Sequence, residues 1–246
     1  MHRTRPGRTA LAALALLAVA AIAAASAGAT APAPAVTVRI EGTSSTLQLP
    51  TSVTLKPGNV DSDGVAGHTC SGLTAAGAIE LATHGNWKGT WSKSLHGYFI
   101  SAVDGLALPS TGAEYWAFWV NDAPASQGIC GYKPKPDDSI LFFPDCYGKK
   151  CPPNDGVLGV KAPATVTAGS PTRVTVTAYS DAAGKPNPKA GANVTGAGAS
   201  AKTAAGGAAT ITFTKPGRFW LAVSAPDTTR TEARICVRTA TSNSCG

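Results

Sequence analysis

The chain has 246 residues, with 27 Gly, 18 Pro and a single Met, and only 14% of its residues are charged. This composition excludes a coiled coil or a helical bundle, both of which are rich in Glu, Lys and Leu. Because 43% of the residues are hydrophobic, it also excludes a chain that is disordered throughout.

The first 27 residues have the three parts of a secretory signal peptide. Three arginines among the first eight residues precede an uncharged apolar run, Ala10 to Ala25, and Ala25-Ser26-Ala27 supplies the small residues of a cleavage site. Cleavage after Ala31 and an uncleaved membrane anchor are the alternatives. Because the apolar run is slightly short for a membrane span, we expect a cleaved signal, no stable transmembrane anchor, and a secreted or cell-surface protein.

The net charge of +7 is unevenly distributed along the chain. Without residues 1–27 there are 18 bases and 14 acids; residues 28–156 carry 8 bases and 11 acids, and residues 157–246 carry 10 and 3. An exported chain without a recognition motif is not expected to bind nucleic acid. The bases of the second half are scattered singly, which indicates a solvated basic face; attraction to anionic cell-wall polymer or lipid headgroups is the alternative.

Six cysteines in an exported chain predict three disulfides, although 15 pairings are possible. Spacing favours a local bridge between Cys146 and Cys151 and a bridge from Cys236 to Cys245 that fixes the C-terminal tail. Cys70 and Cys130 then remain as the third pair. A zinc site is not expected, because there is no C-x-x-C motif and the histidines after the signal, His68, His84 and His96, are not at ligand spacing.

The first half of the mature chain predicts a small α+β domain, residues 36–145, after a Pro/Ala leader at residues 28–35. Val36, Val38 and Ile40 alternate with polar residues and indicate a half-buried strand. Further strands are expected around Leu47 and Leu49, and over residues 98–103, 115–120 and 139–143. Residues 74–81 predict a helix with Thr74 as its N-cap.

A Pro-, Gly- and Cys-rich segment, residues 146–156, marks the boundary to a second domain. Beyond it, alternating apolar residues separated by Gly-rich loops predict short strands and a β-sandwich over residues 157–238. Cys236 alternates out of phase with Ile235 and Val237, so it faces outward and can reach Cys245. Residues 239–246 are then a disulfide-fixed tail.

The first domain resembles a family of secreted bacterial domains of unknown function that are related to the C-terminal β-domain of transcobalamin and intrinsic factor. The resemblance rests on VTVRIEG, HTCSGLTAAGAIELAT, GNWKGTW, YWAFWVND, GICGY and DDSILFF, which together cover most of residues 36–143. It implies a ubiquitin-like β-grasp fold. It also implies a Cys70–Cys130 bridge that ties the helix start to the loop before the last strand.

The vertebrate relatives of that family bind cobalamin between this domain and a large helical barrel, for which these 246 residues show no pattern. Asp122 stands where the family usually has glycine, and a DDS segment replaces its usual Gly-Asp turn. The second domain resembles the immunoglobulin-like modules of bacterial surface proteins. The expected fold is therefore mainly β: a ubiquitin-like β-grasp α+β domain followed by an immunoglobulin-like β-sandwich.

Twelve of the 16 aromatic residues lie between Trp87 and Tyr147. The strand at residues 115–120 carries aromatic side chains on both faces, whereas a sheet packed on one helix fully buries only one. Exposed aromatics predict a platform for a flat-ring ligand such as a corrinoid, or for a cell-wall glycan. The candidate binding residues are Trp87, Trp91, Tyr115, Trp116, Trp119, Asn121 and Tyr132. An interior role for these rings is the alternative.

Motifs for catalysis are missing: there is no G-x-S-x-G, H-E-x-x-H or P-loop, so neither an enzyme nor a cofactor is expected, and a hydrolase is the least favoured reading. Asp61-Ser-Asp63-Gly resembles the start of a calcium loop, but its twelfth position is Gly72 rather than Glu, which indicates a solvated turn. The sequence therefore predicts a secreted, non-enzymatic, two-domain binding protein. A purely structural or adhesive envelope protein is the alternative.

Overall fold

Almost all regular structure in the computed structural model is β-sheet. The structure describes residues 32–109, 113–148, 151, 154–180, 183–242 and 244–245, and within them lie 19 strands and one helix, which confirms a mainly β chain. The predicted signal peptide and the first half of the Pro/Ala leader, residues 28–31, fall outside these residues. No helix in the described part is long and apolar enough to span a membrane.

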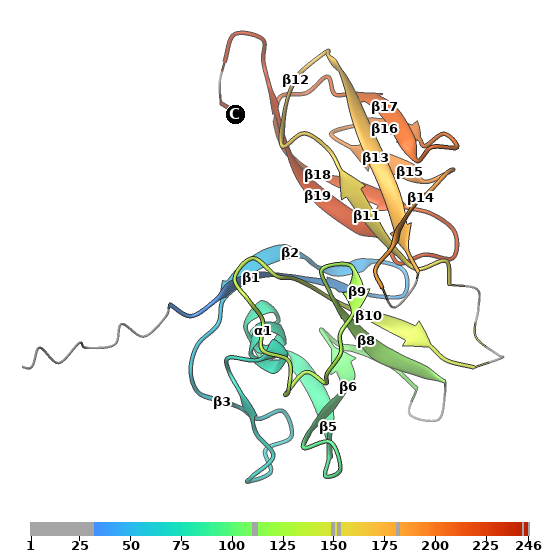
Figure 1. Cartoon of the computed structure of the whole chain (residues 1–246). Helices are drawn as coiled ribbons and strands as arrows, with labels where there is room; N and C mark the ends of the chain where they lie inside the picture. The colour runs from blue at the N-terminus through green and yellow to red at the C-terminus, as the bar shows by residue number, and fades with distance from the viewer. Residues whose placement is uncertain are drawn as a thin grey trace, which may run out of the picture. The chain divides into compact units, whose positions relative to one another are not determined.

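A five-stranded sheet is assembled from both ends of the first half of the chain, in the order β2-β1-β10-β8-β9 (Figure 1). β1 and β10 lie side by side and parallel, with Val38 opposite Ile140, and the other neighbouring strands are antiparallel. The strands are β1 (Ala35–Glu41), β2 (Thr46–Thr54), β8 (Glu114–Val120), β9 (Ala123–Pro124) and β10 (Ser139–Cys146).

β1 is buried more completely than its sequence pattern predicts. Val36, Val38 and Ile40 face the interior as expected, but Arg39 and Glu41 on the opposite face are buried as well. The alternation predicts a half-buried strand. This prediction is wrong from Val38 onward, where every residue of β1 is buried. The reason is that Arg39 and Glu41 contact other buried charged groups instead of water.

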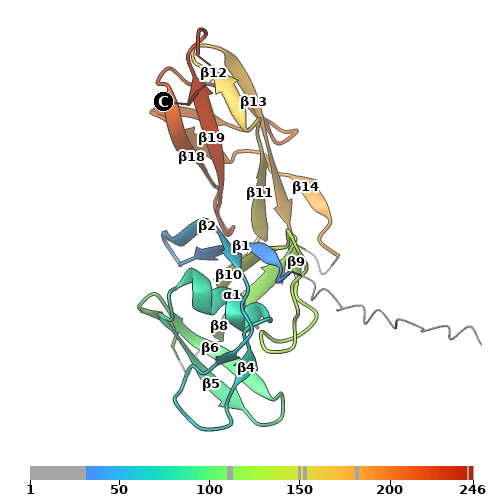
Figure 2. The same cartoon turned by 90° about the vertical axis from the view of Figure 1, so that its left-hand side faces the viewer.

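The helix α1 (Ala75–Ala82) packs against one face of this sheet (Figure 2). Five of its side chains, four of them alanines, are at most 2% exposed, and small side chains let the helix approach its neighbours closely. Thr74 occupies the N-cap position as predicted, but its hydroxyl donates to Ser71 O instead of accepting from the helix. The amides of Ala75 and Ala76 donate to the carbonyls of Tyr132 and Ile129, so a distant loop supplies the cap.

Two smaller sheets complete the first half. β5 (Trp87–Ser92), β6 (Gly97–Val103) and β7 (Leu106–Ala107) form an antiparallel sheet, and β3 (Asn59–Val60) pairs with β4 (Cys70–Ser71). The sequence pattern predicts β6 but not β5. The register of β5 shifts between Lys88 and Gly89, and this irregularity breaks the alternation by which a strand is recognised.

The second half contains two sheets whose inward-facing side chains share one core. One sheet has the order β11-β13-β14, with β17 also paired to β13, and the other has the order β12-β19-β18-β15-β16. The predicted inward faces are confirmed: Val174, Val176, Ile211, Leu221 and Ile235 are at most 2% exposed. The strands are β11 (Val157–Lys161), β12 (Thr165–Thr167), β13 (Pro171–Tyr179), β14 (Pro186–Pro188), β15 (Asn193–Gly196), β16 (Ala199–Lys202), β17 (Ala208–Thr212), β18 (Gly217–Ser224) and β19 (Thr231–Arg238).

All six cysteines are paired as predicted. The Cα–Cα distances are 5.0 Å for Cys70–Cys130, 5.6 Å for Cys146–Cys151 and 5.3 Å for Cys236–Cys245. Cys70–Cys130 joins the segment before α1 to the loop whose carbonyls cap that helix.

Buried apolar side chains form two large clusters. One draws on residues 36–142 and the other on residues 158–237. A third, small cluster contains Ala117, Leu141 and Phe143 from the first sheet together with Val157 from β11. The exact domain limits around residues 146–156 stay a prediction, and residues 33–246 form one compact unit.

Candidate functional site

Strand β8 sends its side chains alternately into two different surroundings. Trp116, Phe118 and Val120 belong to the core that includes α1, as the alternation predicts. Ala117 and Trp119 point to the other face, where Trp119 packs edge-on against Phe143 with ring centroids 5.8 Å apart.

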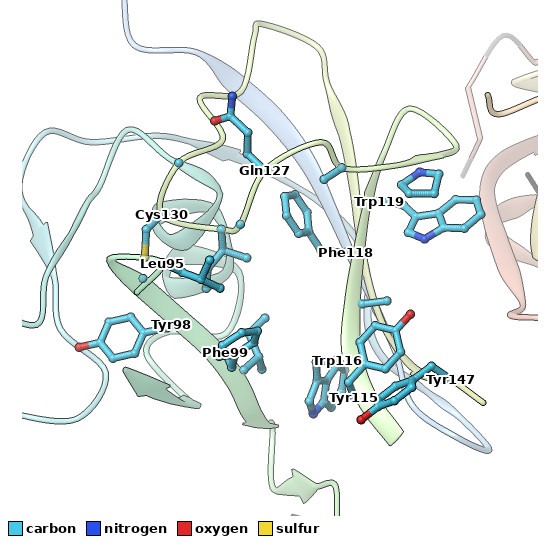
Figure 3. Close-up of a pocket in the computed structure, with 18 residues that line it drawn as sticks. Leu95, Tyr98, Phe99, Tyr115, Trp116, Phe118, Trp119, Gln127, Cys130 and Tyr147 are labelled. Carbon is cyan, nitrogen blue, oxygen red and sulfur yellow. The ribbon is translucent and has the colours of Figure 1, made fainter. Parts of the chain in front are cut away.

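A cavity of about 910 Å³ lies between β8 and β6. Phe99 from β6 lies on one side of it, and Trp116 and Phe118 from β8 lie on the other (Figure 3). The loop that carries Gln127 and Cys130 closes one end, and Tyr115 and Tyr147 lie at the other. The volume falls within the usual range of small-molecule sites, about 300–1,000 Å³.

Two unpaired strand edges border this cavity. Residues 97–100 of β6 pair with β5 on one side, and residues 115–117 of β8 pair with β10 on one side. Among the described residues, no strand pairs with their other edges, because β7 reaches only Ala102 and Val103 and β9 reaches only Trp119 and Val120. The cavity is therefore a gap between two sheets and has backbone polar groups along both sides.

Exposed apolar side chains gather at the cavity. Six large apolar side chains are exposed in the described part of the chain, and four of them line it: Leu95 (65%), Phe99 (60%), Tyr115 (42%) and Tyr147 (67%). Single exposed apolar residues are ordinary, but a group of them around a concavity marks a contact surface.

One polar group in the cavity wall has no partner. The indole Nε1 of Trp116 is buried and makes no hydrogen bond, and the whole residue is only 7% exposed. A buried donor without an acceptor is costly, about 1–3 kcal/mol, and is rare in folded proteins. An acceptor on a bound molecule is one means of satisfying it.

Tyr115 has a polar anchor at the rim. Its hydroxyl donates to Asp145 Oδ2 over 3.1 Å, and its ring lies 6.0 Å from that of Tyr147. Burial, reinforced by the Asp145 carboxylate, raises the pKa of Tyr115 to about 12. The phenol is therefore neutral at physiological pH. Among the described residues that line the cavity there is no Lys, Arg, Asp or Glu.

The structure brings three of the predicted binding residues, Tyr115, Trp116 and Trp119, to the cavity. It places the other four elsewhere in the domain. Trp87 and Trp91 pack around Tyr98, with Trp91 also stacked on the ring of His68.

Asn121 and Tyr132 hold a turn together through Asp138. Asn121 Nδ2 donates to Asp138 Oδ1 over 2.8 Å, and the Tyr132 hydroxyl donates to Asp138 Oδ2 over 3.0 Å. The backbone N–H of Lys135 also donates to this carboxylate. Both side chains are thus committed to hydrogen bonds within the protein, and neither lines the cavity.

Leu95, Phe99, Gln127 and Tyr147 also line the cavity, and the sequence pattern does not single them out as binding residues. Phe99 could have been found from the alternation within the predicted strand 98–103, because Tyr98 is buried and Phe99 therefore faces the other way. Leu95, Gln127 and Tyr147 carry no comparable pattern.

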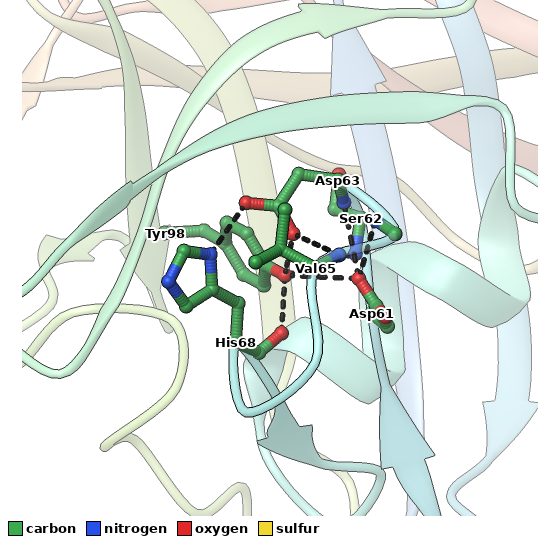
Figure 4. Close-up of polar contacts among 7 residues, drawn as sticks. Asp61, Ser62, Asp63, Val65, His68 and Tyr98 are labelled. Carbon is green, nitrogen blue, oxygen red and sulfur yellow. Dashed lines mark hydrogen bonds and ion pairs between the residues drawn. The ribbon is translucent and has the colours of Figure 1, made fainter.

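The turn at Asp61 to Gly64 uses its carboxylates to bind its own backbone (Figure 4). Asp61 Oδ1 accepts from the amides of Asp63 and Gly64, and Asp63 Oδ1 accepts from the amide of Val65. The hydroxyl of Tyr98 adds contacts to both carboxylates and to His68 O. Asp61, Asp63 and Gly64 are exposed, as the predicted solvated turn requires; the hydrogen bonds to the turn's own backbone are not part of that prediction.

His68 completes this cluster. Its Nδ1 lies 2.8 Å from Asp63 Oδ2. Burial opposes ionisation of Asp63, but hydrogen bonds from His68, Val65 and Tyr98 outweigh it and lower the pKa of the carboxyl. Within the described residues, no group of three or more His, Cys, Asp or Glu is arranged to hold a metal ion.

Comparison with known proteins gives one family match. A family model described as "Domain of unknown function (DUF4430)" matches residues 74–143, which run from the start of α1 into β10 and include both cavity strands, β6 and β8. No curated protein matches the chain.

Several solved structures are similar at low identity. A "putative metal binding protein" from Ruminococcus gnavus is 12% identical over 47% of this chain and 99% of that one, with a TM-score of 0.34. Haptocorrin in complex with Cbi is 18% identical over 46% of this chain and 25% of that one, with a TM-score of 0.35. The Arg specific cysteine proteinase gingipain R is 17% identical over 41% and 22%, with a TM-score of 0.28. The chain thus spans a quarter or less of the last two.

Proposed function

We propose that the chain is a secreted, non-enzymatic binding protein whose first module takes a flat, mostly apolar small molecule in the cavity between β6 and β8. One observation carries this proposal: four of the six exposed large apolar side chains in the described residues converge on a cavity whose wall contains an unpartnered donor, Trp116 Nε1.

The chemistry of the lining favours a neutral ring over a sugar chain. Phe99 and Trp116 offer aromatic surface from opposite sides, whereas the described lining residues include no charged side chain and few polar ones. A glycan would need several hydrogen bonds besides ring stacking. A large, flat ring with an acceptor at its edge suits this lining better than a cell-wall glycan does, and a corrinoid is used below as the flat-ring probe.

The fold assignments and the cellular location belong to the same proposal. The parallel neighbours β1 and β10, with α1 packed on their sheet, support a ubiquitin-like β-grasp in residues 36–145. Two sheets around one core support an immunoglobulin-like sandwich in residues 157–238, which would space or dock the first module. Three disulfides support an oxidising destination, consistent with the predicted signal peptide.

Equilibrium dialysis of the chain without residues 1–27 tests the ligand proposal. The probes are a corrinoid and a soluble cell-wall polysaccharide fragment, used in parallel. Phe99→Ala removes an exposed ring from the cavity and should weaken corrinoid binding about tenfold or more, as expected for loss of a central aromatic contact. Leu49→Ala is the matched control, because Leu49 is also exposed but lies outside the cavity.

Trp116→Phe examines the unpartnered donor, since it keeps an aromatic ring and removes the indole N–H. We expect a smaller loss of corrinoid affinity, about fivefold to tenfold, as for one hydrogen bond. If wild type takes up neither probe, or if the Phe99 variant binds as well as wild type, the ligand proposal fails and a structural or adhesive role replaces it.

A further inference from the structure

Four charged side chains from distant parts of the sequence meet where β2 contacts β19 and the side chain of Arg39, on β1, approaches Glu232. Arg39 Nη1 lies 3.0 Å from Glu41 Oε1 and 3.8 Å from Glu232 Oε2, and Arg230 Nη1 lies 3.8 Å from Glu41 Oε2. Arg39, Glu41 and Glu232 are all at most 9% exposed. Buried charges are stable only when they are paired and hydrogen-bonded.

The hydrogen bonds around Thr46 place a proton in this cluster. Thr46 Oγ1 lies 2.9 Å from Glu41 Oε2 and also contacts Glu232 Oε1 within hydrogen-bond distance. A hydroxyl has one hydrogen, so it can donate to only one of the two carboxyl groups. The other contact is a hydrogen bond only if that carboxyl group is protonated and donates to Thr46.

The balance of charge agrees with one added proton. Facing Glu41 and Glu232 are Arg39 from β1 and Arg230 from the segment before β19, and Asp122, after β8, interacts with Arg39. With every group ionised, two positive charges oppose three negative ones. One added proton makes the cluster neutral, as a buried site with little water requires. Burial raises the pKa of Asp122 as well as that of Glu41, so the charge balance alone does not choose between them. The contacts of Thr46 place the proton on the glutamate pair.

We propose that Glu41 and Glu232 share one proton through Thr46, and that this proton holds β19 against the hairpin of β1 and β2. The contact is a pH-sensitive joint between the two halves of the chain. It is tight in acid and weaker once the proton is lost.

The direction of the pH dependence follows from the ionisation of Glu41. Burial, and then the neighbouring Glu232 carboxyl, raise the pKa of Glu41 from 4.5 to about 8, although Arg39 opposes the shift. The folded chain therefore keeps a proton that the unfolded chain releases. Stabilisation is complete below the ordinary pKa, declines as the pH rises from about 4.5 to about 8, and does not change further above that.

Glutamate-selective ¹³C labelling makes the proton directly visible, because the chain has only four glutamates: Glu41, Glu80, Glu114 and Glu232. The carboxyl carbons of the chain without residues 1–27 are followed by NMR from pH 4 to 9. The Glu41→Gln and Glu232→Gln variants assign the carboxyl signals of these two residues. We expect the pair to keep one proton at pH 7, seen as one of its two signals at the protonated position or, with fast exchange, as both signals midway between the protonated and ionised positions. If all four signals are at the ionised position at pH 7, the proposal is wrong.

The contact itself is followed through the nuclear Overhauser effect between the Thr46 methyl group and the Glu232 side chain. It should weaken from pH 5 to pH 9 in parallel with loss of the proton. An Overhauser effect of unchanged intensity across that range would show that the proton does not hold β19 against the hairpin, and would contradict the proposal.

Thermal unfolding supplies a check that does not depend on assignment. The melting temperature of wild type should fall between pH 5 and pH 8, and Glu232→Gln should reduce that fall by about half or more, because a neutral amide imitates the protonated acid. Glu114→Gln, at an exposed position on β8, should keep the wild-type fall. Equal pH dependence in all three proteins argues against the proposal. If Glu232→Gln does not fold, the wild-type NMR titration decides alone.

Discussion

The indole Nε1 of Trp87 donates a 2.7 Å hydrogen bond to Glu80 Oε2, and so fastens β5 to α1. Trp87 is only 4% exposed, and its ring meets that of Tyr98 edge to face. A residue that the sequence offers as a ligand platform is therefore part of the interior packing, and its neighbours leave no open ring face.

Trp87→Phe should lower stability and leave ligand binding unchanged. The substitution keeps much of the ring but removes the donor to Glu80, so we expect a loss of about 1–3 kcal/mol in the free energy of unfolding. Urea unfolding gives the stability, and the dialysis assay gives corrinoid affinity. A large loss of affinity in a fully folded Trp87→Phe protein would mean that the binding surface lies at β5 rather than at the cavity.

The part of this site that could be predicted from the sequence is the part that depends on neighbouring residues alone. Alternation along β8 gives the two faces of Trp116 and Trp119 correctly, because a strand turns successive side chains to opposite sides wherever it is placed. Alternation does not tell which face is covered. The sequence offers Trp87 as a platform residue, with an interior role as the alternative, and the half-buried pattern of residues 36–41 places Arg39 on the solvent side. Both side chains are buried by residues far away in the chain.

The cavity depends on still more distant relationships. It needs the free edge of β6 to face the free edge of β8, and the two strands belong to different sheets. Pairing partners and gaps between sheets are properties of the assembled fold. The disulfides were predictable for the opposite reason, since two of the pairs are close in sequence and only one pair then remained.

The bridges should differ in their contribution to stability. In the chain-entropy model a closed loop of 60 residues stabilises by about 4 kcal/mol, and one of nine residues by about 2.5 kcal/mol. The Cys70→Ser, Cys130→Ser double variant should therefore lose more than the Cys236→Ser, Cys245→Ser one, and it also frees the loop that caps α1. The midpoints of urea unfolding of the two variants test this order. Equal losses of stability in the two variants would show that the helix cap does not depend on the Cys70–Cys130 bridge.

Asp138 should make the chain sensitive to acid. Burial opposes its ionisation, but the amide of Lys135, Asn121 and Tyr132 all donate to it and lower its pKa below 3.8. For a lowered pKa the stabilisation is present above the ordinary value and is lost as the pH falls through the folded-state value. Asp138→Asn turns one acceptor into a donor and should cost about 1–3 kcal/mol at pH 7.

The same variant should also lose less additional stability than wild type when the pH is lowered from 5 to 2. Urea unfolding at a series of pH values measures both effects. Asp137→Asn, at the exposed neighbouring position, is the control and should behave as wild type. An acid response of Asp138→Asn that equals that of wild type would assign the acid sensitivity to other carboxyl groups.

Gly77 should tolerate no side chain, because α1 touches the backbone in front of it. A Cβ at this position would lie 1.9 Å from the carbonyl oxygen of Gly72, which is backbone and cannot turn aside. Alanine ordinarily favours a helix by up to about 1 kcal/mol over glycine, so helix propensity alone predicts that Gly77→Ala stabilises. Because of this close approach, Gly77→Ala should destabilise the chain instead. We expect a loss of about 3 kcal/mol or more in the free energy of unfolding, at the upper end of the cost of overpacking.

Gly206→Ala is the control, since a Cβ at that position has no heavy atom within 4 Å. Urea unfolding separates the two expectations: a Gly77→Ala protein as stable as wild type would mean that α1 does not sit against Gly72.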